Sequence, residues 1–239
     1  MTGPPARWPP APAPAVSRGW ELAILSAMSA TRHNDHPFDA VVVVGSQGAL
    51  DGFKVVLGCL PAGFPAAVVF DLHRNDQHGL TEHVLRRYSA LPIRSAAEAL
   101  ALEPGTVYVA PWDRQLVVTD ERRLSLREST ISGPGHPYAD ALLASAARAF
   151  GPRLIAVVLS GRLDRGTDGV RAAKDGGARV LVQDPETAAA PSMPRAALAT
   201  GAVDFALPPD SLGQALVALC AAPGGADLFR VRLNAGVRG

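Results

Sequence analysis

The chain has 239 residues, which suits one large domain with or without a tail, and 48% of them are hydrophobic, enough for a sizeable core. The formal net charge of +1 does not indicate a nucleic-acid binder, and no apolar run reaches the roughly 18 residues that a membrane span needs. The two cysteines, Cys59 and Cys220, form no CxxC pair. Unpaired cysteines favour reduced thiols, so we expect a cytoplasmic protein without membrane insertion.

Residues 1–37 are expected to form an N-terminal tail. Residues 1–19 are rich in Pro and Ala, which is typical of extended polyproline-like backbone and unlike a signal peptide. The spacing of apolar residues over 20–32 predicts a short amphipathic helix. A polar linker with His33 and His36 follows, and the sequence offers no third metal ligand near this pair.

Residues 38–221 alternate between strand and helix patterns and are predicted to form one domain, followed by a C-terminal tail over 222–239. Residues 105–129 differ, because alternating segments split by turn residues predict an antiparallel excursion. The short β-branched runs predict strands over 38–45, 65–73, 153–161, 178–184 and 203–208. The helical spacings predict helices over 49–61, 79–90, 138–151, 169–177, 193–201 and 210–220.

This alternation predicts an α/β fold, a doubly wound and mainly parallel sheet with helices on both faces and a small antiparallel excursion. Ligands bind such sheets beyond the carboxyl ends of the strands. Three predicted strand ends carry polar residues, in "VVVVGSQG", "VVFDLH" and "VVLSGRLDRGTDG". They supply a serine, a histidine and two acids, which are the ingredients of nucleophilic catalysis, namely Ser46, His73, Asp164 and Asp168.

Each of these residues also has a purely structural alternative. Ser46 precedes a helical pattern, so it is either an N-cap or a nucleophile whose oxyanion is held by the N–H groups of Gln47 and Gly48. His73 is either a base or a structural side chain, and both acids suit helix capping equally well. The other histidines after residue 70 lack a strand context and are expected at the surface, namely His78, His83 and His136.

Known cofactor motifs are absent from the sequence. The loop after residue 44 has neither G-x-G-x-x-G nor G-x-x-x-x-G-K-[ST], and "VGSQG" lacks the first glycine of G-x-S-x-G. We therefore expect no cofactor and no metal ion.

Several long blocks in one order resemble the chemotaxis protein-glutamate methylesterase family, whose catalytic domain is called CheB. The blocks are "VVVVGSQGALDGFKVVLGCLPAGFPAAVVFDLH", "LEPGTVYVAPWDRQLVV", "VVLSGRLDRGTDGVRAAKDGGARVLVQDPETA" and "SMPRAALATGAVDFALP". The resemblance implies a doubly wound fold and hydrolysis of glutamate γ-methyl esters on receptors, with release of methanol, and in some members deamidation of glutamine. It implies a serine, a histidine and an aspartate, and places the first two on Ser46 and His73.

The sequence departs from the family pattern at the acid. The family reads L-[ST]-G-x-x-x-D-G, and here Arg165 stands where the aspartate is expected. Asp164 lies one residue before it and Asp168 one helical turn after it, so either carboxylate is a candidate substitute. Because residues 1–38 are too few for a domain of about 100 residues, we also expect a stand-alone protein without a receiver domain.

Three functional hypotheses follow from the sequence. The first is an active serine hydrolase of methyl-ester type that acts on a methylated receptor-like protein. The second is a catalytically weakened family member that binds such a partner. The third is a hydrolase that acts on a small-molecule ester or amide. The sequence does not indicate an oligomeric state.

Overall fold

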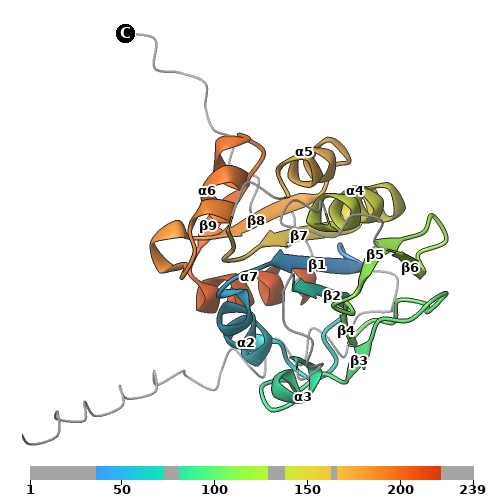
Figure 1. Cartoon of the computed structure of the whole chain (residues 1–239). Helices are drawn as coiled ribbons and strands as arrows, with labels where there is room; N and C mark the ends of the chain where they lie inside the picture. The colour runs from blue at the N-terminus through green and yellow to red at the C-terminus, as the bar shows by residue number, and fades with distance from the viewer. Residues whose placement is uncertain (1–35, 73–80, 129–137, 163–165, 222–239) are drawn as a thin grey trace, which may run out of the picture.

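The computed structural model of the chain describes residues 36–72, 81–128, 138–162 and 166–221. These residues form a seven-stranded sheet in the order β3-β4-β2-β1-β7-β8-β9 and a separate two-stranded hairpin of β5 and β6 (Figure 1). Neighbouring strands of the large sheet run parallel, and the two strands of the hairpin run antiparallel.

The strands are β1 Ala40–Gly45, β2 Ala67–Leu72, β3 Ile93–Ser95, β4 Val107–Val109, β5 Arg114–Val118, β6 Leu124–Glu128, β7 Leu154–Val158, β8 Arg179–Gln183 and β9 Phe205–Leu207. The helices are α2 Ala49–Cys59, α3 Thr81–Leu85, α4 Tyr138–Phe150, α5 Thr167–Asp175, α6 Ser192–Ala199 and α7 Pro209–Ala221, with short 3-10 turns η1 Gly151–Arg153 and η2 Pro185–Thr187.

The central strand β1 is buried along its whole length, because layers of helices cover both faces of the sheet. Helices α2 and α7 lie on one face, while α4 and α5 lie on the other (Figure 1). Side chains alternate between the faces, so Val41 and Val43 belong to the core under α2 and α7, and Val42 and Val44 to the core under α4 and α5. This alternation assigns each later strand residue to a face.

The sheet reverses its winding between β1 and β7. From β1 the chain passes through α2 to β2 on one side, and from β7 it passes through α5 to β8 on the other side. The connections that leave the carboxyl ends of β1 and β7 therefore turn to opposite faces of the sheet. The point between them is the topological switch point, where doubly wound sheets bind ligands.

The predicted fold class is confirmed, with two corrections to the strands. Residues 107–109 were assigned to the antiparallel excursion, but β4 pairs parallel with β2 and β3, and only β5 and β6 form the antiparallel hairpin. Strand β3 was not predicted at all. It has only three residues, two of them exposed, so its sequence carries too little hydrophobic alternation to identify a strand.

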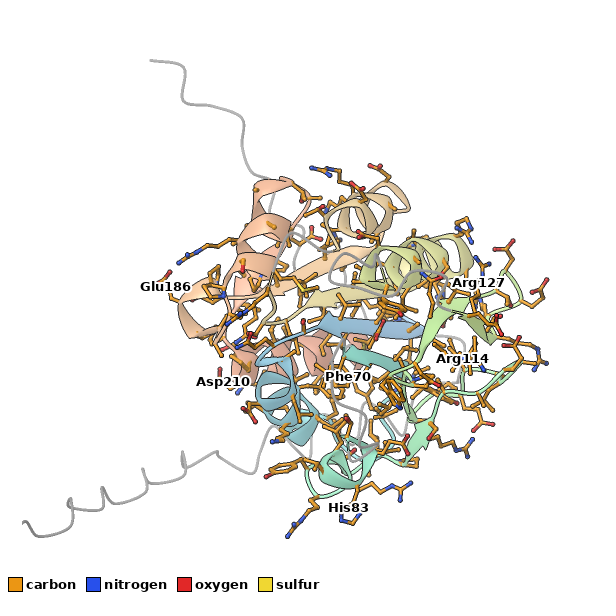
Figure 2. The ribbon with its side chains drawn as sticks, viewed as in Figure 1. Phe70, His83, Arg114, Arg127, Glu186 and Asp210 are labelled. Atoms are coloured by element: carbon orange, nitrogen blue, oxygen red, sulfur yellow. The ribbon has the colours of Figure 1, made fainter. Side chains whose placement is uncertain are left out.

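The predictions for the linker and surface histidines were only partly confirmed. His36 was expected in a polar linker, yet it is 8% exposed and its Nδ1 lies 3.2 Å from the carbonyl oxygen of Cys220. His83 lies on α3 and points outward, as expected (Figure 2). The predicted helix over 20–32, together with His33, His78 and His136, lies outside the described residues.

Two further findings bear on the class of protein. Cys59 and Cys220 are both free thiols, as expected. Across the part of the chain that the structure describes, no helix combines the length and the hydropathy of a membrane-spanning segment.

Candidate active site

The loops that follow β1 and β7 meet at the switch point, and Ser46 lies in the first of them. The backbone N–H of Ser46 donates to the carbonyl oxygen of Ser160 over 2.9 Å, which extends the pairing of the two strands by one step. The N–H of Ala49, the first residue of α2, donates back to the carbonyl oxygen of Ser46 over 3.1 Å. Ser46 thus stands between the end of a buried strand and the start of a helix.

The turn into α2 requires glycine at Gly48. This residue has φ +78°, and a Cβ there would lie 2.6 Å from the Cβ of Ala189 and 2.8 Å from the Oγ of Ser160. Gly161, in the opposite loop, has no positive φ, but a Cβ there would lie 2.5 Å from the Sδ of Met193 and 3.2 Å from the Cβ of Ser46. The two loops therefore pack closely around the serine, and glycine at both positions leaves room for this approach.

Ser160 and Gln183 hold this arrangement in place from β7 and β8. The N–H of Ser160 donates to Gln183 Oε1 over 2.9 Å, and its hydroxyl donates to the carbonyl oxygen of Gln47 over 2.7 Å. The same hydroxyl accepts from the N–H of Ala190 over 2.9 Å. Both side chains are almost completely buried, so these bonds are made away from water, where they hold the loop firmly.

The N-cap alternative for Ser46 is wrong. The N-cap of α2 is Gly48, and no side chain caps the helix. Ser46 is half-buried at the positive end of the helix dipole. Among the described residues, neither the N–H of Gln47 nor that of Gly48 donates a hydrogen bond. Two donors beside a serine, at a helix N-terminus, are the arrangement that an oxyanion needs.

His73 and Asp164 lie outside the described residues, as does Arg165. The strand that leads to His73 is described, and its last residue, Leu72, pairs in register with Gly45, the last residue of β1. The residues that directly precede Ser46 and His73 are therefore neighbours on adjacent parallel strands.

Asp168 lies in the first turn of α5, with its side chain 87% exposed and paired with Arg171 over 2.9 Å. Its alternative role as a helix cap is wrong, because the N-cap of α5 is Gly166. Asp140 of α4 satisfies this helix end instead, accepting from the N–H groups of Gly166 and Gly169 over 3.1 and 2.7 Å. A carboxylate in water beside a cation is poorly suited to orient a histidine, which weighs against Asp168 as the acid.

The sequence analysis did not select Asp71, the second-last residue of β2. Burial raises the pKa of this carboxyl from its ordinary value to about 6. The signal was present in the sequence, because an aspartate interrupts the apolar run "AVVFDL". Ser160 and Gln183 were missed for a similar reason, since each is a single polar residue at the end of an apolar strand.

In the described part of the chain, no three His, Cys, Asp or Glu side chains gather into a possible metal site. The other charged side chains that Figure 2 labels are Arg114, Arg127, Glu186 and Asp210, and they lie toward the periphery of the molecule. Glu186, for example, pairs with Arg195 at the surface over 3.2 Å.

Comparison with known proteins identifies relatives of the whole described domain. A family model described as CheB methylesterase matches residues 41–216. The chain is 35% identical over 184 residues to protein-glutamate methylesterase FrzG of Myxococcus xanthus, covering 76% of this chain and 54% of that protein. It is 34% identical over 219 residues to a protein-glutamate methylesterase/protein-glutamine glutaminase of Moorella thermoacetica, covering 88% of this chain and 50% of that protein.

A solved structure shares the fold. The crystal structure of the Thermotoga maritima CheB methylesterase catalytic domain matches with a TM-score of 0.70 and 28% sequence identity, covering 75% of this chain and 97% of that chain. The chain thus spans about half the length of these two curated relatives and nearly all of the solved catalytic domain.

Proposed function

Because the chain belongs to the CheB methylesterase family, we propose that it is a serine hydrolase that removes methyl groups from glutamate γ-methyl esters in a protein substrate. The observation that carries this proposal is the position of Ser46, at the switch point of the sheet and at the N-terminus of α2. The backbone donors of Gln47 and Gly48 lie beside it. Its relatives bear the names protein-glutamate methylesterase and protein-glutamine glutaminase.

The proposed reaction has two halves. The Oγ of Ser46 attacks the ester carbonyl carbon while His73 takes its proton, and the resulting oxyanion is held by the N–H groups of Gln47 and Gly48. Methanol then leaves with the proton from the histidine, and the acyl group stays on the serine. In the second half a water molecule, deprotonated by the same base, releases the glutamate carboxylate and restores Ser46.

Hydrolysis of a glutamine side-chain amide follows the same steps, with ammonia in place of methanol. The amide is the more difficult substrate, because its nitrogen leaves only after protonation. We therefore propose ester hydrolysis as the main activity and deamidation as a slower one.

We also propose that the protein works in the cytoplasm on a methylated receptor-like partner. Support for the compartment comes from the thiols, since Cys59 and Cys220 are unpaired. Burial raises the pKa of both thiols, which keeps them protonated and unreactive.

A binding protein without catalytic activity is the second candidate. Its support is the acid position, where the sequence has Arg165 and the nearby Asp168 is exposed to water. A hydrolase of small esters or amides is the third.

The deciding experiment incubates the protein with a synthetic peptide that carries one glutamate γ-methyl ester and measures methanol. We expect methanol release, covalent labelling of Ser46 by a fluorophosphonate, and loss of both in Ser46→Ala. Ser125→Ala, which removes a hydroxyl from the hairpin that bonds Glu98, is the matched control and should behave as wild type.

The two other candidates give different results in the same experiment. Labelling together with hydrolysis of p-nitrophenyl acetate, but not of the peptide, would indicate a small-molecule hydrolase. An unlabelled serine, no hydrolysis and retained binding of the methylated peptide would indicate a binding protein.

A further inference from the structure

We propose that Ala189 is a specificity-determining residue, whose small side chain leaves room for the backbone of a protein substrate beside Ser46. The inference rests on the proposed hydrolase function and deepens it, because it concerns how much of a substrate can approach the serine. It follows from the contact of Ala189 with the turn that carries Ser46, from the exposure of Ala189 and from the hydrogen bonds that fix its backbone.

Ala189 packs directly against the nucleophile turn, residues 46–48. The Cβ of Ala189 lies 2.6 Å from the position that a Cβ on Gly48 would take. Because a carbon–carbon bond measures about 1.5 Å, this Cβ lies within about 4 Å of the Cα of Gly48, which is van der Waals contact. The N–H of Gly48 is one of the two proposed oxyanion donors. Ala189 therefore borders the point at which the ester carbonyl would bind.

Ala189 touches the nucleophile turn and is nevertheless exposed to solvent. Gln47 of the turn is exposed as well, and Ser46 is half-buried, whereas the next residue of the segment, Ala190, is buried. Every residue except glycine has a Cβ, so a larger side chain at position 189 would keep the contact with Gly48. Its further atoms would then occupy the solvent side of the turn, where a substrate has to approach.

Hydrogen bonds on both sides of Ala189 hold its backbone in place. Before it, Gln183 Nε2 donates to the carbonyl oxygen of Thr187 over 3.1 Å. Directly after it, the N–H of Ala190 donates to Ser160 Oγ over 2.9 Å. Gln183 and Ser160 are both buried, so these bonds are made away from water. Ala189 is thus a fixed part of the site rather than a loop tip that yields to a substrate.

The segment that carries Ala189 is also fastened at its far end. The N–H of Met193, in the first turn of α6, donates to the carbonyl oxygen of Gly161 over 3.0 Å. At the surface, Glu186 of η2 pairs with Arg195 of α6 over 3.2 Å. The chain from η2 to α6 therefore forms one side of the site, and its side chains limit what fits beside Ser46.

The short reach of a glutamate γ-ester makes this side of the site important for a protein substrate. Three carbon–carbon bonds separate the ester carbonyl carbon from the backbone Cα, a span of about 4 Å at most. The attacking oxygen must lie roughly 3–3.5 Å from the carbonyl carbon. The substrate backbone therefore comes within about 7 Å of the Oγ of Ser46. The residues that flank the glutamate then meet the groups that border the turn, and Ala189 is such a group.

A purely structural role is the alternative, in which Ala189 only fills the space beside Gly48. The two roles predict different kinetics. A side chain that displaced the nucleophile turn would slow the hydrolysis of every ester alike. A side chain that only narrows the approach would slow an ester that carries a backbone and spare a small one.

The test compares two methyl esters by methanol release. One is the peptide with a single glutamate γ-methyl ester, and the other is methyl butyrate, which reproduces the side chain and its ester without the backbone. We expect Ala189→Phe to lower kcat/KM for the peptide at least about tenfold, mainly through a higher KM, and for methyl butyrate by no more than about threefold.

Two further variants complete the experiment. Ala189→Ser adds one small atom and should stay within about twofold of wild type for both esters. Ala199→Phe makes the same change as Ala189→Phe at an exposed position of α6. It is the matched control and should behave as wild type toward both esters.

Each outcome decides. An active wild type that is silenced by Ser46→Ala but unchanged toward the peptide by Ala189→Phe overturns this inference and leaves the proposed function standing. Equal losses for the two esters in Ala189→Phe assign a structural role and also overturn it. A wild type that hydrolyses methyl butyrate but not the peptide overturns the protein substrate together with this inference. A wild type that releases no methanol and is not labelled at Ser46 by a fluorophosphonate overturns both proposals.

Discussion

The backbone N–H of Ser46 donates a 2.9 Å hydrogen bond to the carbonyl oxygen of Ser160, and this bond joins the two loops that leave the sheet at its switch point. Ser160 is held in turn by Gln183 of β8 and by the N–H of Ala190. The position of the proposed nucleophile therefore depends on a strand two places away in the sheet. Residues of several strands, rather than one loop alone, fix the position of Ser46.

Removing the hydroxyl of Ser160 should weaken both the fold and the proposed activity. Ser160→Ala leaves the buried N–H of Ala190 and the partly buried carbonyl oxygen of Gln47 without their present partner, which costs about 1–3 kcal/mol in the free energy of unfolding. Because the carbonyl of Gln47 is then unfixed, we expect kcat/KM to fall at least about tenfold. Urea unfolding and methanol release measure the two effects.

Ser192→Ala is the control for that variant, since the hydroxyl of Ser192 makes only a 3.4 Å contact with the carbonyl oxygen of Gly161. Equal losses in the two variants would show that the Ser160 network does not position the loop.

Two effects oppose a side chain at Gly48: the positive φ angle of its backbone and the close contacts that a Cβ would make. A comparison with Gly201 separates the two effects. Gly48 and Gly201 have similar positive φ angles, +78° and +71°, but a Cβ on Gly201 would meet nothing within 4 Å. Gly201→Ala should therefore cost only the conformational strain, about 1–2 kcal/mol. Gly48→Ala adds contacts with Ala189 and Ser160, for about 1–3 kcal/mol more, and should abolish most of the hydrolysis.

Thermal unfolding and fluorophosphonate labelling of both glycine variants test this difference. Matching losses of stability would mean that the loop shifts freely to accept a side chain. Unchanged labelling of Ser46 in Gly48→Ala would contradict a tightly fixed nucleophile.

An ion-pair cluster at the opposite edge of the sheet should control stability at low pH. Burial alone would raise the pKa of Asp39, but the hydrogen bonds and charges of Arg153 and Arg122 outweigh it and lower the pKa. A lowered folded pKa stabilises the protein above the unfolded pKa of about 3.9 and loses that stabilisation as the pH falls through the folded value. Asp39→Asn should cost about 1.5–3 kcal/mol at pH 7 and flatten the decline below pH 4.

Urea unfolding between pH 2.5 and 7 measures this dependence. Asp120→Asn is the control, because Asp120 and Arg148 are exposed and 3.9 Å apart, and it should change the stability by under about 1 kcal/mol. A decline with pH that is identical in wild type and Asp39→Asn would rule out Asp39 as its source.

The sequence predicted those features that are local or periodic. The Val41–Val44 run identified a buried strand, and the change from apolar to Gly and Ser after it placed Ser46 at a strand end. These predictions hold because a strand covered on both faces must be apolar along its length. The parallel direction of β1, β2 and β7 followed from the alternation of strands and helices, whereas their order in the sheet did not.

The sequence did not predict polar residues whose role depends on distant partners. His36 is buried against Cys220, which lies 184 residues further along the chain. Asp71 and Gln183 each stand among apolar residues, and only the register of the sheet shows what they face. No local pattern distinguishes such residues from an occasional exposed polar side chain, because the difference lies in the tertiary neighbours.

Arg165 provides the last prediction, since it stands at the position where the family pattern has its aspartate. If another carboxylate already orients the base, Arg165→Asp should change methyl-ester hydrolysis only about threefold or less, because a second acid adds little to a base that is already oriented. Arg171→Asp, the same charge change on the exposed face of α5, controls for the altered net charge. An increase of several orders of magnitude in Arg165→Asp alone would show instead that the native site lacks a working acid, since the new aspartate would then supply both the acceptor and the favourable charge. The two results differ by far more than the error of a methanol assay.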